Sequence, residues 1–321
     1  MRTACGRDWN IELEAAVNSP TASARLRVGI VSAGRVGTAL GEALVAAGHH
    51  VNSVVANSPQ SAARVHDRLP SAEICDLNSL VAASDLIVVA VPDTVLADVA
   101  SQIAAADAFR PGIIVTHTAG AHGVDVLGPI ARRGGIVLAT HPAMTFVGTR
   151  DDTARLSASC FGVTAADEIG DAIAMALVLE LGATPIRIAE TSRTLYHAAL
   201  AHGANNLNAL IIDAVTALQA AIAGPGGHAA RTATVDGGSI GLAEQLLAPL
   251  VTASLENVLA QGRSALTGPV ARGDIDTVAR HLDELSDVHE GIAHGYRVLA
   301  GRAAAQHDSP QALREMLEAH P

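Results

Sequence analysis

The sequence contains no lysine, because all 21 of its basic residues are arginine. A lysine side chain is the usual source of a Schiff-base amine, an ammonium acid or a point-charge clamp on phosphate. These three chemistries are therefore excluded for this chain. Any cationic contact to a substrate or cofactor has to come from an arginine guanidinium or a protonated histidine.

Aromatic residues are also scarce, at 2% of the chain, and the formal net charge is -11. Proteins that bind nucleic acid need a concentrated basic face, and those that bind single strands add aromatic side chains on which bases stack. We therefore expect no nucleic-acid partner.

Cysteine is limited to Cys5, Cys75 and Cys160. Their odd number and wide spacing match neither a disulfide framework nor a metal-ligand motif, so we expect buried thiols in a reducing compartment. The histidines show no compact ligand spacing either, and no metal site is predicted.

Long uninterrupted apolar runs are missing. His, Asp, Gly or Pro breaks each apolar stretch before about 18 residues, and the N-terminus lacks an apolar signal core. We therefore expect a soluble, cytoplasmic protein without a membrane partner. The chain has 321 residues, of which 49% are hydrophobic, and this predicts two domains with sizeable cores.

Residues 26–51 read as a strand, a glycine turn and a helix. In a G-x-G-x-x-G turn the second glycine lets backbone approach a pyrophosphate, and the third lets the helix pack close to its strand. Gly34 and Gly37 occupy these places, whereas Ser32 replaces the first glycine. A small residue fits there if the turn needs no positive φ. An ordinary strand–turn–helix of another α/β protein is the alternative. The predicted cofactor contacts in this turn are Ser32, Ala33, Gly34, Arg35, Val36 and Gly37.

Further apolar runs of the kind found in buried parallel strands follow along the chain, separated by helical stretches such as 95–106. Their ranges are 50–56, 85–91, 112–117, 135–142 and 184–188. This alternation predicts an α/β fold with a doubly wound, mostly parallel Rossmann sheet. Beyond about residue 192 the Ala- and Leu-rich spacing predicts an all-helical domain. We expect a flexible extension over 1–24, a dinucleotide-binding domain over 25–190, and a helical substrate and dimerisation domain over 191–321.

Polar residues that follow the parallel strands are expected to line the ligand site, because ligands of open α/β sheets bind beyond the carboxyl ends of the strands. Thr118 is placed to contact a nicotinamide or a substrate. The segments at predicted strand ends are Asn57-Ser58, Val91-Pro92-Asp93, His117-Thr118 and His141-Pro142.

The same region favours NADP over NAD. In NAD-binding domains an acidic residue about 20 positions after the turn holds the ribose 2′-hydroxyl, and Asn57 stands at that place. Without a carboxylate there is no repulsion of a 2′-phosphate, for which Ser58, Arg35 and Arg64 are possible donors. No arginine directly follows the second strand, so Arg35 or Arg64 would have to reach the phosphate. For Arg64 a solvated helix face is an equal alternative.

Six motifs carry a family resemblance over residues 26 to about 300: Ser-Ala-Gly-Arg-Val-Gly (32–37), Val-Pro-Asp (91–93), His-Thr-Ala-Gly (117–120), Thr-His-Pro-Ala-Met-Thr-Phe (140–146), Tyr-His-Ala-Ala (196–199) and Ala-Leu-Thr-Gly-Pro-Val-Ala-Arg-Gly-Asp (265–274). The chain resembles the 6-phosphogluconate-dehydrogenase-like superfamily, which includes ketopantoate reductase and pyrroline-5-carboxylate reductase. Its closest likeness is to a Rossmann-like family with a helical domain of long-unknown function. Some members of that family are linked to an alternative class of ketopantoate reductase.

This resemblance implies NADP-dependent reduction of a 2-keto acid, but two features depart from it. Ser32 replaces the common first glycine, and the lysine that better-known relatives use in catalysis cannot be supplied. Arg193 and Thr194 occupy the place before Tyr-His where such a lysine would be sought. The mechanism of those relatives is therefore not transferable.

Hydride transfer to a ketone or imine also needs a proton donor and an anchor for a substrate carboxylate. On the helix predicted from residue 191, at about 100° per residue, His197 and Asn205 fall within one arc of about 80° and face the same cleft. A histidine delivers a proton near neutral pH, and an asparagine amide orients a carbonyl. The catalytic candidates are His197, Asn205, Tyr196 and His141. Packing of Tyr196 and a structural role for His197 are the alternatives.

Substrate contacts are expected from Asn206 and Arg272, because the Arg272 guanidinium can clamp a carboxylate bidentately. Asp274 is better explained as a helix N-cap. The leading function is NADP-dependent reduction of a small 2-keto acid, with ketopantoate favoured by the resemblance. A non-catalytic NADP-binding sensor or interaction protein and a pyrroline-5-carboxylate-type imine reductase are the alternatives. A homodimer is expected.

Overall fold

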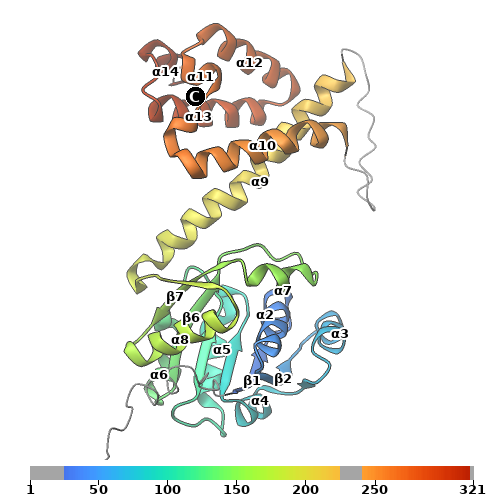
Figure 1. Cartoon of the computed structure of the whole chain (residues 1–321), viewed down its shortest axis with the longest axis vertical. Coiled ribbons are helices and arrows are strands. Elements are labelled where there is room, and N and C mark those ends of the chain that lie inside the picture. Colours follow the sequence, from blue (N-terminus) through green and yellow to red (C-terminus); the bar gives the residue numbers. More distant parts are fainter. Residues whose placement is uncertain (1–24, 225–240, 319–321) are drawn as a thin grey trace, which may run out of the picture. The chain divides into compact units, whose positions relative to one another are not determined.

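The computed structural model describes residues 25–224 and 241–318, and it divides into two compact units, Met1–Leu200 and Ala201–Pro321 (Figure 1). The last strand of the sheet ends at Arg187, and helix α9 (Arg193–Ala223) runs across the division. The predicted extension over 1–24, which includes Cys5, lies outside the described residues.

The first unit is built on one eight-stranded sheet in the order β3-β2-β1-β4-β5-β6-β7-β8. All neighbouring strands pair in parallel except β6 and β7, which are antiparallel. The fold is therefore the predicted mostly parallel, doubly wound sheet. Strand bounds are β1 Arg27–Val31, β2 His50–Val55, β3 Glu73–Ile74, β4 Leu86–Val89, β5 Ile114–His117, β6 Ile136–Pro142, β7 Cys160–Ala165 and β8 Thr184–Arg187.

Six of these strands match the predicted apolar runs, and β3 and β7 were not predicted. Strand β3 has two residues, too few to show a pattern. Strand β7 reads Cys-Phe-Gly-Val-Thr-Ala, with a glycine inside it, yet its central four residues are buried. Its first residue, Cys160, is exposed and Cys75 is partly buried. The expectation of buried thiols is therefore wrong for Cys160, because this residue lies where the strand begins rather than inside it.

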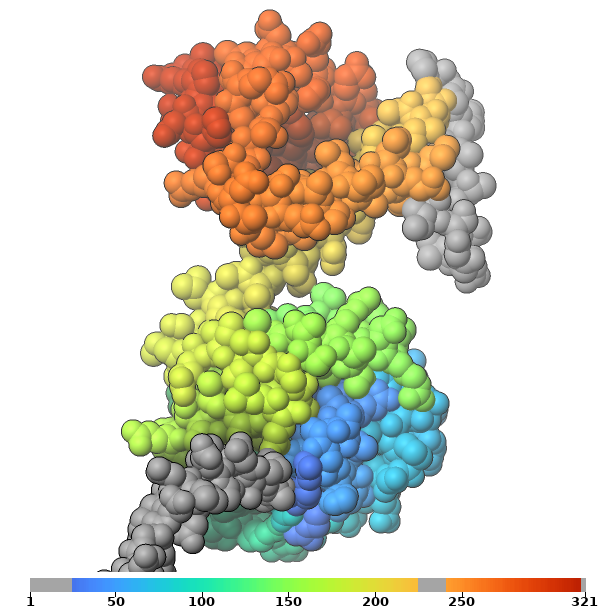
Figure 2. Space-filling model, in the orientation of Figure 1, coloured from blue at the N-terminus to red at the C-terminus, as the bar shows by residue number. Residues whose placement is uncertain are grey.

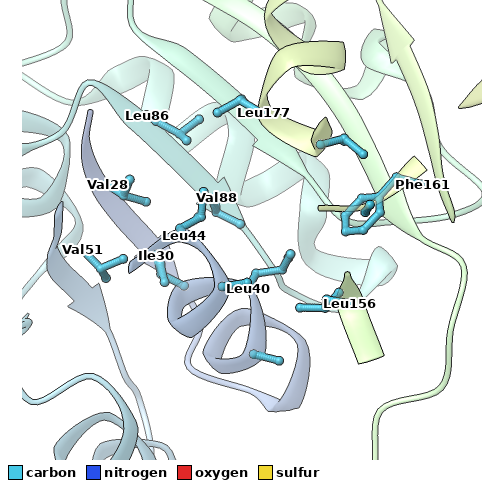
Figure 3. Close-up of a cluster of buried hydrophobic side chains, with 14 of the residues drawn as sticks. Val28, Ile30, Leu40, Leu44, Val51, Leu86, Val88, Leu156, Phe161 and Leu177 are labelled. Carbon is cyan, nitrogen blue, oxygen red and sulfur yellow. The ribbon is translucent and has the colours of Figure 1, made fainter. Parts of the chain in front are cut away.

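Helices cover both faces of the sheet and bury two apolar cores (Figure 1). Leu40 and Leu44 of α2 and Leu177 of α8 pack on one face, where Figure 3 shows them around the strand residues. Leu96 and Ile103 of α5 pack on the other. Helix bounds in this unit are α2 Arg35–Ala46, α3 Pro59–Arg68, α4 Leu77–Ala83, α5 Asp93–Ala105, α6 Gly128–Arg132, α7 Asp151–Leu156 and α8 Glu168–Glu180, with 3-10 turns η1 Val124–Leu127 and η2 Glu190–Ser192.

The second unit is helical in its described residues, as predicted. A small core around Val278, Ala304 and Leu313 joins its C-terminal helices. Asp274 is the N-cap of α12 and accepts a hydrogen bond from the Thr277 N–H at 3.1 Å, which confirms its structural role. After α9, the elements are α10 Leu242–Gln261, η3 Gly262–Ala265, α11 Gly268–Arg272, α12 Ile275–Val288, α13 Glu290–Gln306 and α14 Gln311–Glu318.

One helical stretch, Glu190–Ala223, is long and apolar enough to cross a membrane by length and composition alone. This differs from the expectation, which looked for an uninterrupted apolar run. Polar residues do interrupt this stretch, but they are dispersed among apolar ones, so its mean hydropathy stays high. A single helix of this kind is weak support for a membrane span. Its first turns carry side chains that pack into the sheet unit, including the fully buried Arg193.

Candidate functional site

The glycine turn joins β1 to α2 as predicted, but Ser32 does not have the backbone conformation expected of a small L-residue. Its φ is +82°, in the region that favours glycine. The Ser32 N–H donates to the Val55 carbonyl at 3.1 Å, which holds the turn against the end of β2. The turn thus has the geometry of a glycine at its first position, with a serine in that place.

Gly37 and Gly34 have the roles that the motif predicts. A Cβ on Gly37 would lie 2.2 Å from the Ser32 carbonyl oxygen, so α2 packs against the turn at a distance only glycine allows. At Gly34 the nearest atom to such a Cβ, the Ser32 hydroxyl oxygen, is 3.7 Å away. The space over Gly34 is therefore open to a ligand.

The N-terminus of α2 has no side-chain cap, so its first backbone N–H groups are available to an anion. Its N-cap is Gly34, no side chain caps it, and its first turn holds no acidic residue. By contrast, Ser58, Asp76 and Asp167 cap α3, α4 and α8 with their side chains. The first amides of a helix have no partner inside the helix and lie at the positive end of its dipole. The turn residues therefore fit the diphosphate of a dinucleotide.

Two arginines border this turn. The Arg64 Nε donates to the Ala33 carbonyl at 3.1 Å, so its guanidinium lies beside the turn rather than on a solvated face. The Arg35 side chain packs against Gly148, whose built Cβ would lie 3.3 Å from the Arg35 Cγ. Asn57 is exposed after β2. The Ser58 hydroxyl accepts from the Ser61 N–H at 3.1 Å and is occupied as a helix cap.

The remaining predicted cofactor contacts lie at strand ends. Val91, Pro92 and Asp93 follow β4, and Pro92 is the N-cap of α5. Thr118 follows β5, and its N–H donates to the Val89 carbonyl at 3.2 Å, which ties the two strand ends together. These residues and the glycine turn lie at one edge of the sheet, because β1, β4 and β5 are parallel neighbours.

Three of the four catalytic candidates form a cluster at the end of β6 and the start of α9. The His141 Nδ1 and the Tyr196 hydroxyl are 2.9 Å apart and hydrogen-bonded. The rings of His141 and His197 meet edge to face, with centroids 5.8 Å apart. All three residues are partly buried. The structure thus brings together residues that lie 55 positions apart in the sequence.

Two glycines make room for this cluster. A Cβ on Gly120 would lie 2.5 Å from the His197 Cδ2 and 2.9 Å from the His141 Nε2. A Cβ on Gly162 would lie 2.6 Å from the Tyr196 hydroxyl oxygen. The loop after β5 and the middle of β7 can therefore lie this close to the cluster only because Gly120 and Gly162 have no side chain.

The cluster favours a neutral histidine beside a protonated tyrosine. Burial, the nearby His197 and the Arg193 charge lower the pKa of His141 to about 4. Burial also raises the pKa of Tyr196 above its usual value of 10.0, although Arg193 acts in the opposite direction. Near neutral pH, Tyr196 therefore keeps its proton and His141 is an uncharged hydrogen-bond partner.

His117 is a structural histidine. It is fully buried, its Nε2 lies 2.7 Å from the Gly123 carbonyl oxygen, and its Nδ1 accepts from the Ala119 N–H at 3.2 Å. Burial lowers its pKa to about 4. Both ring nitrogens are used to shape the loop that carries Gly120.

The other predicted residues belong to the second unit and are exposed. Asn205 stands on α9, two turns beyond His197. The Asn206 Nδ2 lies 2.9 Å from the His202 Nδ1, so its amide is engaged within the helix. Arg272 ends α11. Their part in the site stays a prediction.

Sequence reasoning missed Arg193 as a site residue. It is 1% exposed and lies one helical turn before Tyr196 and His197. Its guanidinium carbon is 5.8 Å from the centroid of the Tyr196 ring. The sequence offered one signal, because Arg193 stands shortly before the Tyr-His pair, where a catalytic residue is sought. Arginine side chains are rarely buried, however, so a surface position is the ordinary expectation.

Comparisons with known families match the chain in two parts. Residues 13–142 match a Rossmann-like domain, and residues 159–303 match a domain of unknown function (DUF2520). No curated protein sequence is significantly similar to the chain.

Solved structures share the fold at low sequence identity. A Bacteroides fragilis protein described as a "putative NADP oxidoreductase" has a TM-score of 0.70 and 20% identity, with 88% of this chain and 98% of that chain covered. A reductive aminase from Aspergillus terreus in complex with NADPH has a TM-score of 0.54 and 16% identity, covering 92% and 93%. Pyrroline-5-carboxylate reductase from Coxiella burnetii has a TM-score of 0.52 and 15% identity, covering 89% and 99%.

Proposed function

We propose that this chain, which joins a Rossmann-like domain to a DUF2520 domain, is an NADP-dependent reductase of a small 2-keto acid. The observation that carries the proposal is the hydrogen-bonded pair of His141 and Tyr196, which lies at the same sheet edge as an uncapped helix N-terminus behind a glycine turn. A dinucleotide turn and a proton donor together are what carbonyl reduction requires.

NADP is the proposed cofactor because of the charges around the turn. The chain has Asn57 where NAD-binding domains have an acidic residue, so a 2′-phosphate meets no like charge. Arg64 and Arg35 border the turn and can donate to phosphate oxygens. The likeness to the fold of proteins solved with NADPH supports the same assignment.

In this proposal the cofactor supplies a hydride to the substrate carbon, and the chain supplies the proton. Tyr196 donates its hydroxyl proton to the carbonyl oxygen, on which negative charge develops. When the His141 Nδ1 carries the imidazole proton, it donates to the Tyr196 oxygen and leaves the hydroxyl proton free for the substrate. His197 packs edge-on against His141 and holds the ring in place.

The substrate is proposed from the motif resemblance, which favours ketopantoate among the small 2-keto acids. Imine reduction is the second candidate, because a tyrosine that protonates an oxygen can also protonate a nitrogen and because the fold is shared with pyrroline-5-carboxylate reductase and a reductive aminase. Oxidation of NADPH by the purified protein with ketopantoate, other 2-keto acids and pyrroline-5-carboxylate separates these candidates. Absence of turnover with the whole panel would refute the proposal and leave the alternative of a non-catalytic NADP-binding protein.

The chain offers a matched control for the proposed donor. It has two tyrosines, and the Tyr296 hydroxyl also lies 2.9 Å from a histidine Nδ1, that of His281. Tyr196→Phe is expected to lower kcat about 100-fold or more with little change in NADPH affinity, whereas Tyr296→Phe loses an equivalent hydrogen bond and keeps kcat. Equal losses in both variants would show that the hydroxyl of Tyr196 matters only for packing.

A homodimer is proposed as the working assembly. Helices α9 and α10 bury almost none of their residues in the described part of the chain, and orange atoms, the colour of α10, lie on the surface in Figure 2. An apolar surface of this kind marks a protein interface. The exposed apolar residues on the two helices include Leu210, Ile212, Ile222, Leu246, Leu250, Leu255, Val258 and Leu259.

A further inference from the structure

Arg193 is a buried cation whose hydrogen-bond partners are all neutral. Its Nε donates to the Thr164 hydroxyl at 2.7 Å, and its Nη2 donates to the carbonyls of Ala139 and Gly162 at 2.9 and 3.1 Å. Its Nη1 is buried and has no hydrogen-bond partner among the described residues. The guanidinium thus lies between β6 and β7, and no described carboxylate forms an ion pair with it.

Burial of such a charge is unfavourable, because desolvation of a cation is repaid only by a nearby anion or by several good hydrogen bonds. Burial also lowers the pKa of Arg193 from its usual value of 12.5. The charge of Glu190 partly stabilises the guanidinium, but this carboxylate does not bond to it and instead accepts from the N–H groups of Val124 and Asp125 at 2.7 and 3.3 Å. The positive charge is therefore only partly compensated.

This partly compensated charge lies close to the aromatic ring of the proposed proton donor, Tyr196. The Arg193 guanidinium carbon is 5.8 Å from the centroid of the Tyr196 ring, whose hydroxyl binds His141. His117, His141 and His197, the histidines around this point, carry no negative charge to offset it. In a poorly hydrated site, a charge at this distance acts strongly on a second charge.

We propose that Arg193 is the residue that makes this site select substrates bearing a carboxylate. The inference rests on the proposed reductase function and adds the determinant of substrate charge. A carboxylate seated next to Tyr196 would supply the missing counter-charge, whereas a neutral analogue of the same shape would not. Arg193 acts through its field, because its guanidinium is buried among β6, β7 and α9, and it is therefore a positioning residue rather than a catalytic one.

The test compares a 2-keto acid with its neutral methyl ester in the full-length protein. For the wild type, kcat/KM is expected to favour the acid by about 10-fold or more. Arg193→Gln, which removes the charge and keeps hydrogen-bonding groups, is expected to lower this preference 10- to 100-fold, and Arg193→Lys to restore most of it. Arg187→Gln, which removes an exposed arginine paired with Asp171, is the matched control and should leave the preference unchanged. A purely structural role would reduce both substrates equally, and that result would overturn the proposal.

A binding measurement keeps the test independent of turnover and of the fold of the Gln variant. Calorimetry with NADPH-saturated wild type compares oxamate with its neutral diamide, oxamide. The charge selection is supported if the wild type binds oxamate tightly and oxamide weakly, and if this difference is lost in Arg193→Gln or retained in Arg193→Lys. This result counts even where no keto acid is reduced. Equal binding of the two, or reduction of acid and ester with equal kcat/KM, overturns it while leaving the proposed reductase intact.

Discussion

Replacing Ser32 with glycine is expected to stabilise the Rossmann unit. Ser32 has a φ of +82°, which costs an L-residue about 1–2 kcal/mol relative to the common regions of backbone conformation. Glycine removes this cost but loses about 0.5–1 kcal/mol through its greater freedom in the unfolded chain. The serine hydroxyl forms no hydrogen bond among the described residues, and the backbone bond from its N–H to Val55 survives the change. The net gain is about 0.5–1 kcal/mol.

Thermal unfolding measures this gain, which corresponds to a rise in Tm of about 1–4 °C for a unit of this size. Ser32→Ala is the control, because alanine keeps the Cβ that makes the conformation unfavourable and removes only the hydroxyl. We expect the order of stability to be Gly above Ser, with Ala at or below Ser. If the glycine variant is no more stable than the alanine variant, the strain assigned to the turn is not real.

Three further predictions follow from the site and the surface. Gly162→Ala should lower kcat at least 10-fold while NADPH still binds, because a Cβ there would lie 2.6 Å from the Tyr196 hydroxyl oxygen; kinetics and fluorescence titration check the two effects. His117 and His141, with pKa values lowered to about 4, are neutral in the folded state, whereas the unfolded chain binds protons below about pH 6.5. The free energy of unfolding in urea should therefore fall as pH drops from 6.5 towards 4, by at most about 1.4 kcal/mol per pH unit for each histidine, and His141→Asn should reduce that slope. Leu250→Glu should shift the mass measured by light scattering from dimer to monomer, and an unchanged mass would remove α10 from the interface.

The sheet was predictable because its buried parallel strands are continuous apolar runs. The segment Leu-Ile-Val-Val of β4 and the apolar part of β6, which ends at Pro142, can each be read directly from composition. Strand β7 could not be, because its glycine and cysteine weaken the pattern and its antiparallel pairing with β6 leaves no local signal. That strand nevertheless supplies Gly162, without which Tyr196 could not reach His141.

The site was predictable in its residue types but not in its pairings. Strand ends placed His141 at the ligand edge, and helical spacing placed Tyr196 and His197 on one helix, but only the fold brings the two segments within hydrogen-bond distance. The positive φ of Ser32 was not visible either, because serine is rarely found in that conformation.

Arg193 was hidden for a further reason. Charged side chains are ordinarily placed at the surface by sequence reasoning, since burial costs them their hydration. In this chain the backbone carbonyls of β6 and β7 accept its hydrogen bonds, which makes burial of the guanidinium tolerable. These two carbonyls come together around one guanidinium only after the strands have paired, so the sequence alone does not reveal them.

The absence of lysine explains why the proposed proton donor is a tyrosine supported by a neutral histidine. A lysine in such a site would combine a positive charge and a transferable proton in one ammonium group. Here the two properties are separated: the Arg193 charge is permanent and cannot be given up as a proton, while Tyr196, whose pKa is raised by burial, holds the proton. Since His141 stays neutral down to about pH 4, its own titration cannot switch the donor off between pH 5 and 8. The rate of the chemical step should therefore be flat across that range, whereas a histidine acting as the acid would give a rate that falls with increasing pH.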